Sequence, residues 1–169
     1  MFPNPNVDSG VEKSRLERFT ALLKEGGTPF VVEENIQIRR WEKVVWNVAW
    51  NSITSLTMVD TQTWLKSTPQ AIPMTRQLMH EVIDVARKVG VPLKEGLVDE
   101  LFVRILALPG IITSTQNDVK AKNPLEIDVI MGVPVRKARG LGVPIPTLEV
   151  IYTLVAAVDY GVREGKIYT

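Results

Sequence analysis

The sequence predicts a mainly α-helical protein, a bundle of six or seven helices. Apolar residues recur every three or four positions through most of the chain, which is the spacing of one helix face. Glycine and proline residues separate these stretches and mark where helices stop and start. Hydrophobic residues make up 45% and charged residues 23% of the 169 positions, so the chain can bury a core of its own.

The first part of the chain combines one helix with one strand candidate. Residues 12–25 have apolar side chains at helical spacing, and Gly26-Gly27 ends that helix. Residues 29–32, Pro-Phe-Val-Val, have the pattern of a short strand. A lone strand leaves its backbone N–H and C=O groups unpaired. We therefore interpret the first thirty-odd residues as the tail of an α/β domain whose other strands are missing.

The rest of the chain is expected to form the helical bundle. Its helices start at capping residues or prolines and end at glycines or prolines. The expected helices cover residues 36–59, 61–67, 69–88, 96–108, 124–139 and 146–162. The polar residues 113–122 are expected to connect two helices.

The composition excludes several classes of site. There are no cysteines, which removes disulfides, zinc–thiolate sites, iron–sulfur clusters and cysteine nucleophiles. His80 is the only histidine, so no site can use two, and we expect no metal centre. A net charge of +1 does not indicate nucleic acid or an anionic membrane as a partner. We see neither a signal peptide nor a bilayer-spanning apolar run, and we expect a cytoplasmic protein.

One predicted helix carries a row of polar side chains. Lys43, Asn47 and Asn51 lie at i, i+4 and i+8 and therefore share one face. Their neighbours are nearly all apolar, as in a buried helix. If the row is buried, it needs partners, and a bound ligand is one kind of partner; a lysine held among apolar neighbours can donate a proton near neutral pH. The alternative, which spacing alone favours, is that the row is the solvated face of the helix.

Two later stretches are also rich in polar groups. Residues 112–118 bring hydroxyls and amides together between helices, which suits binding of a small anion. Asn123, followed by Pro124 and by Glu126 three residues after it, has the pattern of a capping box. Glu126 therefore has two interpretations: it satisfies backbone N–H groups at a helix start, which the local pattern favours, or it serves a ligand.

Taken together, these segments resemble the ketopantoate reductase family. Lys43-x-x-x-Asn47-x-x-x-Asn51 is similar to that family's substrate helix, and Ser114 and Glu126 have the family's separation. The resemblance continues in order over residues 36–162, and its further matching positions are Asp118, Ile127, Asp128, Gly132 and the turn from Gly142 to Pro146. The chain departs from the family's usual residues at Ser52, Leu125 and Met131.

The resemblance implies both a fold and an activity. Residues 35–169 would be a helical domain like the C-terminal domain of ketopantoate reductases and 6-phosphogluconate dehydrogenase-like proteins. Residues 1–34 would be a remnant of the end of a Rossmann-type domain. The full-length protein would reduce 2-dehydropantoate to pantoate with NADPH, a step of pantothenate biosynthesis. The Rossmann domain that binds NADP would lie outside this chain, and the chain alone is expected to be inactive.

The same resemblance implies a role for each polar residue. Lys43 would be the catalytic general acid; Asn47, Asn51 and Ser114 would bind the substrate; and Glu126 would contact the cofactor's ribose or orient Lys43. We expect all five to line one wall of a cleft. The implied partners are a small 2-oxo acid, the missing Rossmann domain and a second copy in a homodimer. The rival interpretation is a non-catalytic helical module for dimerisation or partner binding, with the polar row as relic or surface.

Overall fold

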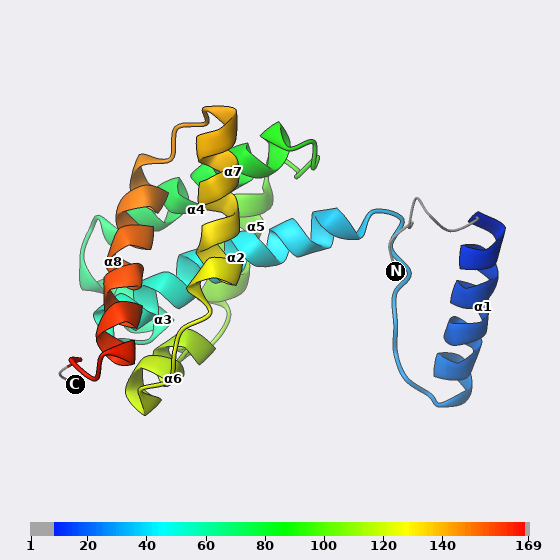
Figure 1. The fold of residues 1–169 in the computed structure, drawn as a ribbon, viewed down its shortest axis with the longest axis horizontal. Helices are drawn as coiled ribbons and strands as arrows, with labels where there is room; N and C mark the ends of the chain where they lie inside the picture. Colours follow the sequence, from blue (N-terminus) through cyan, green and yellow to red (C-terminus); the bar gives the residue numbers. More distant parts are fainter. Residues whose placement is uncertain (1–8, 168–169) are drawn as a thin grey trace. The chain divides into compact units, whose positions relative to one another are not determined.

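The structure, a computed structural model, describes residues 9–167 and is built from helices joined by short connections (Figure 1). Within this range the expected mainly α-helical architecture is confirmed. The elements are α1 Ser9–Glu25, α2 Ile36–Thr57, α3 Thr61–Ser67, α4 Ala71–Lys88, α5 Leu97–Leu106, α6 Ser114–Ala121, the π-helical turn η1 Asp128–Gly132, α7 Val133–Leu141 and α8 Pro146–Arg163.

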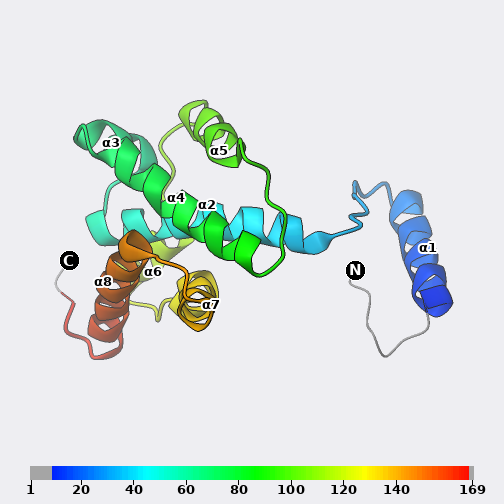
Figure 2. The same ribbon diagram turned by 90° about the horizontal axis from the view of Figure 1, so that it is seen from above.

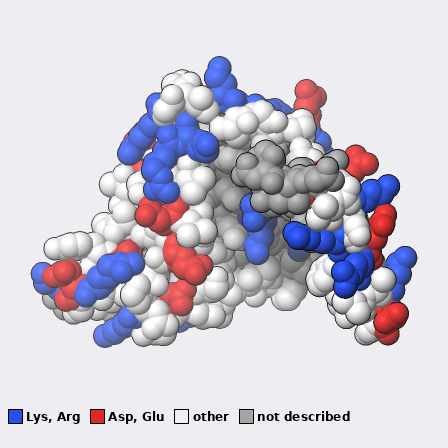
Figure 3. All heavy atoms as spheres, turned by 45° about the vertical axis from the view of Figure 1, so that its right-hand side comes forward, with Lys and Arg blue, Asp and Glu red and all other residues white. Residues whose placement is uncertain are grey.

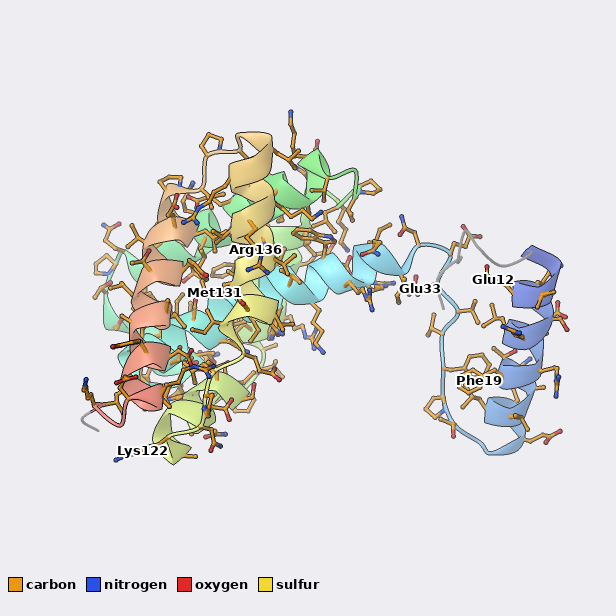
Figure 4. The ribbon with its side chains drawn as sticks, viewed as in Figure 1. Glu12, Phe19, Glu33, Lys122, Met131 and Arg136 are labelled. Carbon is orange, nitrogen blue, oxygen red and sulfur yellow. The ribbon has the colours of Figure 1, made fainter. Side chains whose placement is uncertain are left out.

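The chain divides into two compact units, Met1–Arg39 and Arg40–Thr169. The first contains α1, and none of residues 10–39 is buried. Its apolar side chains, Phe19 among them, surround a hollow of about 390 Å³ between α1 and the stretch that follows it. Figure 4 shows Phe19 projecting from α1 toward that stretch. Residues 10–39 therefore have apolar surface but no buried core.

The strand expected at residues 29–32 is absent. Residues 28–33 form no β ladder with any segment of the described chain. A strand needs a neighbour to take its backbone hydrogen bonds, and residues 9–167 are otherwise helical or irregular. The prediction of a strand is wrong for this chain, whereas the helix predicted before it is present as α1.

The second unit packs its helices around α4. This helix contacts α3, α5, α7 and α8, and its buried face is formed mainly by Leu78, Met79, Val82, Ile83, Val85 and Ala86. Figure 2 shows α2 passing through the unit, with α3 and α5 on one side and α7 and α8 on the other. Every α2 residue from Val48 to Ser55 is buried. The second half of α2 is therefore core, and its first half reaches toward the surface.

Residues 114–121 form the helix α6, where a connection was expected. The Thr113 side chain caps it by accepting a hydrogen bond from the backbone N–H of Gln116. Lys122 ends it in the left-handed conformation, with φ of 58°. The helix is held although its sequence is polar, because Thr115, Gln116 and Val119 are buried against the bundle.

The helix expected to begin at Pro124 begins at Ile127 instead. Asn123 is not its cap, because residues 123–126 are held outside the helix: the Leu125 backbone N–H donates to Asp159 Oδ1 on α8, at 2.7 Å. The backbone carbonyl of Glu126 accepts a hydrogen bond from the Ile130 N–H, so Glu126 stands before the first helical residue. The capping-box interpretation of Glu126 is therefore wrong.

The surface of the molecule carries mixed charge. Figure 3 shows Lys and Arg interspersed with Asp and Glu on the face that it draws, in keeping with a net charge of +1. Among the helices of residues 9–167, none is both long enough and apolar enough to cross a membrane.

Candidate functional site

The polar row on α2 runs from the surface into the core. Lys43 is exposed, Asn47 is half-buried, and Asn51 is only 8% exposed. The interpretation as a solvated face therefore holds for Lys43, and the interpretation as a buried row holds for Asn51. The burial considered for Lys43 is not found: in the first half of α2 only Trp41 and Val45 are buried, and Lys43 lies between them on the exposed side.

Aromatic rings fix α2 against α5. Trp46 and Trp50 meet edge to face, with centroids 5.8 Å apart, and Trp50 meets Phe102 of α5 in the same manner at 6.0 Å. Such pairs contribute about 0.5–1.5 kcal/mol each beyond the area they bury. Because Trp46 directly precedes Asn47 in the helix, these contacts also fix the direction in which the polar row faces.

A small cavity lies beside Asn51, where four elements meet. Its volume is about 10 Å³, about the least that can hold one water molecule. Its lining residues are Asn51 and Ser52 from α2, Thr115 from α6, Ile127, Ile130 and Met131 from the η1 region, and Val155 from α8. Figure 4 shows Met131 on the same helical run as Arg136, which forms an ion pair with Asp128 at 2.9 Å.

The two other predicted segments reach this cavity through immediate neighbours of the predicted residues. Ser114 is the first residue of α6, and the next residue, Thr115, lines the cavity. Glu126 stands one position before Ile127, another lining residue. The segments of Asn51, Ser114 and Glu126 are therefore brought together. Lys43 does not line this cavity, since it lies two helical turns away from Asn51.

A hydrogen bond between two threonines holds α2 to the start of α6. Thr54 Oγ1 lies 2.7 Å from Thr113 Oγ1, and both side chains are buried. No local sequence pattern predicts this bond, because its two partners are 59 positions apart. It sets the position of Ser114, which directly follows Thr113.

The side chains of the five predicted site residues all lack a bonding partner. Within the described chain, none of them makes a hydrogen bond or an ion pair with another residue; they are Lys43, Asn47, Asn51, Ser114 and Glu126. One cation, one carboxylate, two amides and one hydroxyl are therefore free to bind something else. Such a set suits a small molecule that carries carbonyl and carboxylate oxygens.

Comparison with known proteins identifies the family. The family model described as ketopantoate reductase PanE/ApbA C terminal matches residues 35–159. The chain belongs to this ketopantoate reductase C-terminal family. Its helical bundle is the fold of that domain, as solved relatives also show.

Individual members of the ketopantoate reductase family match most of this chain. A 2-dehydropantoate 2-reductase from Pyrobaculum aerophilum is 31% identical over 144 residues, which is 85% of this chain and 51% of that protein. The crystal structure of 2-dehydropantoate 2-reductase from Methylococcus capsulatus matches with a TM-score of 0.80 and 33% identity, over 88% of this chain and 47% of that one. A dimeric ketopantoate reductase from Staphylococcus aureus matches with a TM-score of 0.79 and 28% identity, over 87% and 51%. The chain thus spans about half the length of these relatives.

Proposed function

We propose that this chain is the substrate-binding and catalytic domain of an NADPH-dependent 2-dehydropantoate 2-reductase, which reduces ketopantoate to pantoate. The observation that carries the proposal is the set of five polar side chains that have no hydrogen-bond or ion-pair partner among residues 9–167. They lie on three segments, and the segments of Ser114 and Glu126 meet α2 near Asn51. Family membership supports it, since relatives of about twice this length are named for that reaction.

Each residue has a task in this reaction. Lys43 donates a proton to the alkoxide that develops as the keto group is reduced, and its charge stabilises that alkoxide. The amides of Asn47 and Asn51 hold substrate oxygens. The Ser114 hydroxyl, at the start of α6, donates to the substrate's carboxylate. These groups bind and orient the substrate and supply the proton.

The residues present fit only part of the cofactor. When bound, NADPH supplies the hydride. The 169 residues contain no glycine-rich turn of the kind that places backbone N–H groups against a pyrophosphate. The exposed carboxylate of Glu126 suits the ribose hydroxyls. We assign the pyrophosphate contacts to a Rossmann-type domain outside this chain, and we expect the chain alone neither to bind NADPH tightly nor to turn over substrate.

Substitution of Lys43 tests the proposal in an enzyme that includes the cofactor-binding domain. Lys43→Ala should lower kcat by roughly 10²–10⁴-fold, the usual contribution of a positioned general acid. Lys66→Ala, which removes another exposed lysine, serves as the matched control and should keep full activity. A fully active Lys43→Ala enzyme would refute the catalytic role and favour a non-catalytic helical module.

We also propose that the protein forms a homodimer. One relative is a dimeric ketopantoate reductase. On α8, Val150 and Leu154 lie one turn apart and are 59% and 49% exposed, so this helix has an apolar outer face. Sedimentation equilibrium should give a dimer, and Leu154→Asp should shift it toward the monomer. A monomer at every concentration would refute the proposal.

A further inference from the structure

An arginine on α5 stands beside the polar row of α2. The guanidinium carbon of Arg104 lies over the Trp46 ring, 4.8 Å from its centroid. Trp46 comes three residues after Lys43 and immediately before Asn47. Helix residues three positions apart have Cβ atoms about 5–6 Å apart. The Arg104 guanidinium therefore lies near the Lys43 end of the row.

The charge of Arg104 has no protein partner. Arg104 is exposed and makes no ion pair or hydrogen bond within residues 9–167. The acidic residues of its own helix are already engaged: Asp99 pairs with Arg76 at 2.7 Å, and Glu100 pairs with Lys94. The exposed neighbours Val103 and Leu106 are apolar. Nothing on α5 remains to neutralise Arg104.

Every other arginine in this part of the chain behaves differently. Each of the five others between residues 76 and 163 binds a carboxylate or a backbone carbonyl; they are Arg76, Arg87, Arg136, Arg139 and Arg163. Arg104 is the exception: among the described residues it forms no such bond, and its guanidinium stacks on the Trp46 ring. Stacking uses the face of the guanidinium and leaves its N–H groups free at the edge.

The ring beneath Arg104 is itself fixed. Trp46 contacts Trp50, which is 1% exposed and contacts Phe102 in turn. Arg104 is thus held by a rigid platform. A planar guanidinium with free, pre-oriented donors is suited to bidentate binding of a carboxylate or a phosphate.

We propose that Arg104 is an anion-binding residue of this site. Its ligand is an oxyanion, supplied either by the carboxylate of the 2-oxo acid or by a phosphate of the nucleotide cofactor. The inference rests on the proposed function, because it places Arg104 beside the general acid Lys43. It adds a second cation to a site in which the sequence pattern identified only one.

Kinetics of the two-domain enzyme distinguish the two sources of the anion. Arg104→Gln should raise KM by about 10- to 100-fold, the factor expected for loss of a hydrogen bond between charged groups. A rise in the KM for 2-dehydropantoate assigns the carboxylate, and a rise in the KM for NADPH assigns the phosphate. Arg104→Lys keeps the charge but loses the planar guanidinium that can bind an oxyanion through two hydrogen bonds, so its effect on KM should be smaller. Arg139→Gln removes an exposed arginine of α7 and should change neither constant.

A binding measurement on the 169-residue chain is independent of turnover. The Trp46 indole N–H signal in an NMR spectrum, assigned by Trp46→Phe, reports on the platform. Titration with 2-dehydropantoate or with 2′,5′-ADP should shift this signal in the wild type and not in Arg104→Gln. If Lys43→Ala abolishes turnover while Arg104→Gln changes neither KM nor the titrations, the role of Arg104 is refuted and the proposed function stands. If Lys43→Ala is active, the proposed function itself fails.

Discussion

Glu81 of α4 caps the helix α8 at Leu148. Its Oε2 accepts a hydrogen bond from the Leu148 backbone N–H at 2.7 Å, and its Oε1 accepts one from Thr147 at 3.1 Å. The residue before α8, Ile145, has no side chain that could cap it. Glu81 is 3% exposed, so a buried carboxylate from one helix satisfies one buried and one partly buried N–H group at the start of another and holds the two helices together.

Removal of this carboxylate should destabilise the fold. Glu81→Ala leaves the Thr147 and Leu148 N–H groups without an acceptor, and such a loss costs about 1–3 kcal/mol per buried group. Glu81→Gln keeps one acceptor oxygen and should cost less. Urea unfolding measures both. The control is Gln77→Ala, which deletes only the exposed amide that donates to Glu81. An unchanged urea midpoint for Glu81→Ala would show that the cap contributes nothing to stability.

The two asparagines of the row should act alike on catalysis but differently on stability. In the two-domain enzyme, Asn47→Ala and Asn51→Ala should both raise the KM for 2-dehydropantoate with little change in kcat, because a positioning amide contacts ground and transition states alike. Asn51→Ala should also lower the melting temperature, since Asn51 is 8% exposed and already borders a cavity. Asn117→Ala, on the exposed side of α6, should change neither property. A drop in kcat alone would contradict the positioning role.

Substitution of Glu126 tests its role toward the cofactor or Lys43, without a contribution from helix capping. Since it stands before the helix and not in its first turn, Glu126→Gln should leave the melting temperature unchanged. If its carboxylate serves the cofactor's ribose or Lys43, the same change should reduce kcat/KM by about tenfold or more, the loss of one charge-assisted hydrogen bond. Glu95→Gln provides an exposed control in a loop. Full activity of Glu126→Gln would remove Glu126 from the site.

Gly110 is required where a loop passes Asp60. A Cβ at Gly110 would lie 2.2 Å from Asp60 Oδ1, and the Asp60 carboxylate is held by Gln62 and Thr63. Gly110→Ala should therefore cost about 1–3 kcal/mol in unfolding free energy, the usual range for overpacking. At Gly96 a Cβ meets open space, so Gly96→Ala should be neutral or stabilising. The Gly110→Ala effect should shrink in an Asp60→Ala background, and equal effects in both backgrounds would rule out the clash.

Asp60 should make stability depend on pH in the acid range. The hydroxyl and backbone N–H of Thr63 bind the charged form and hold the Asp60 pKa below its usual value of 3.8. A lowered folded-state pKa gives stability that is present above the unfolded-state pKa and lost as pH falls through the folded one. The difference in stability between wild type and Asp60→Asn should therefore be full near pH 6 and narrow below about pH 4. A difference that grows on acidification would contradict this sign.

Periodicity predicted the helices well where one face is strongly apolar, as in α4 and α8. It failed for α6, because Val119 is the only apolar residue among the buried residues of that helix. The Thr113 cap with Gln116 three positions later was a usable local signal. No local signal opposed Asn123 as a cap, because the contact that keeps residues 123–126 out of the helix comes from Asp159 on α8.

For the candidate site, the sequence predicts a set of residues but not their arrangement in space. Spacing placed Lys43, Asn47 and Asn51 on one face, and the structure shows that their burial increases along it. This increase in burial depends on how distant segments pack against α2, so the spacing of residues along the helix cannot predict it. Arg104 was missed for a related reason, since its significance lies in a contact with Trp46 across two helices.

The exposed position of Lys43 has a consequence for when its charge can act. Two unit charges 4 Å apart interact by about 1 kcal/mol in bulk water, by about 4 kcal/mol at the effective dielectric constant of about 20 that is typical near protein surfaces, and more strongly still as water is excluded. The stabilisation that the exposed Lys43 gives to a developing oxyanion therefore increases when water is displaced from the outer end of the row. Under the proposed function, closure of the cofactor-binding domain would strengthen the electrostatic contribution of Lys43, and the timing of dehydration would become part of the chemistry.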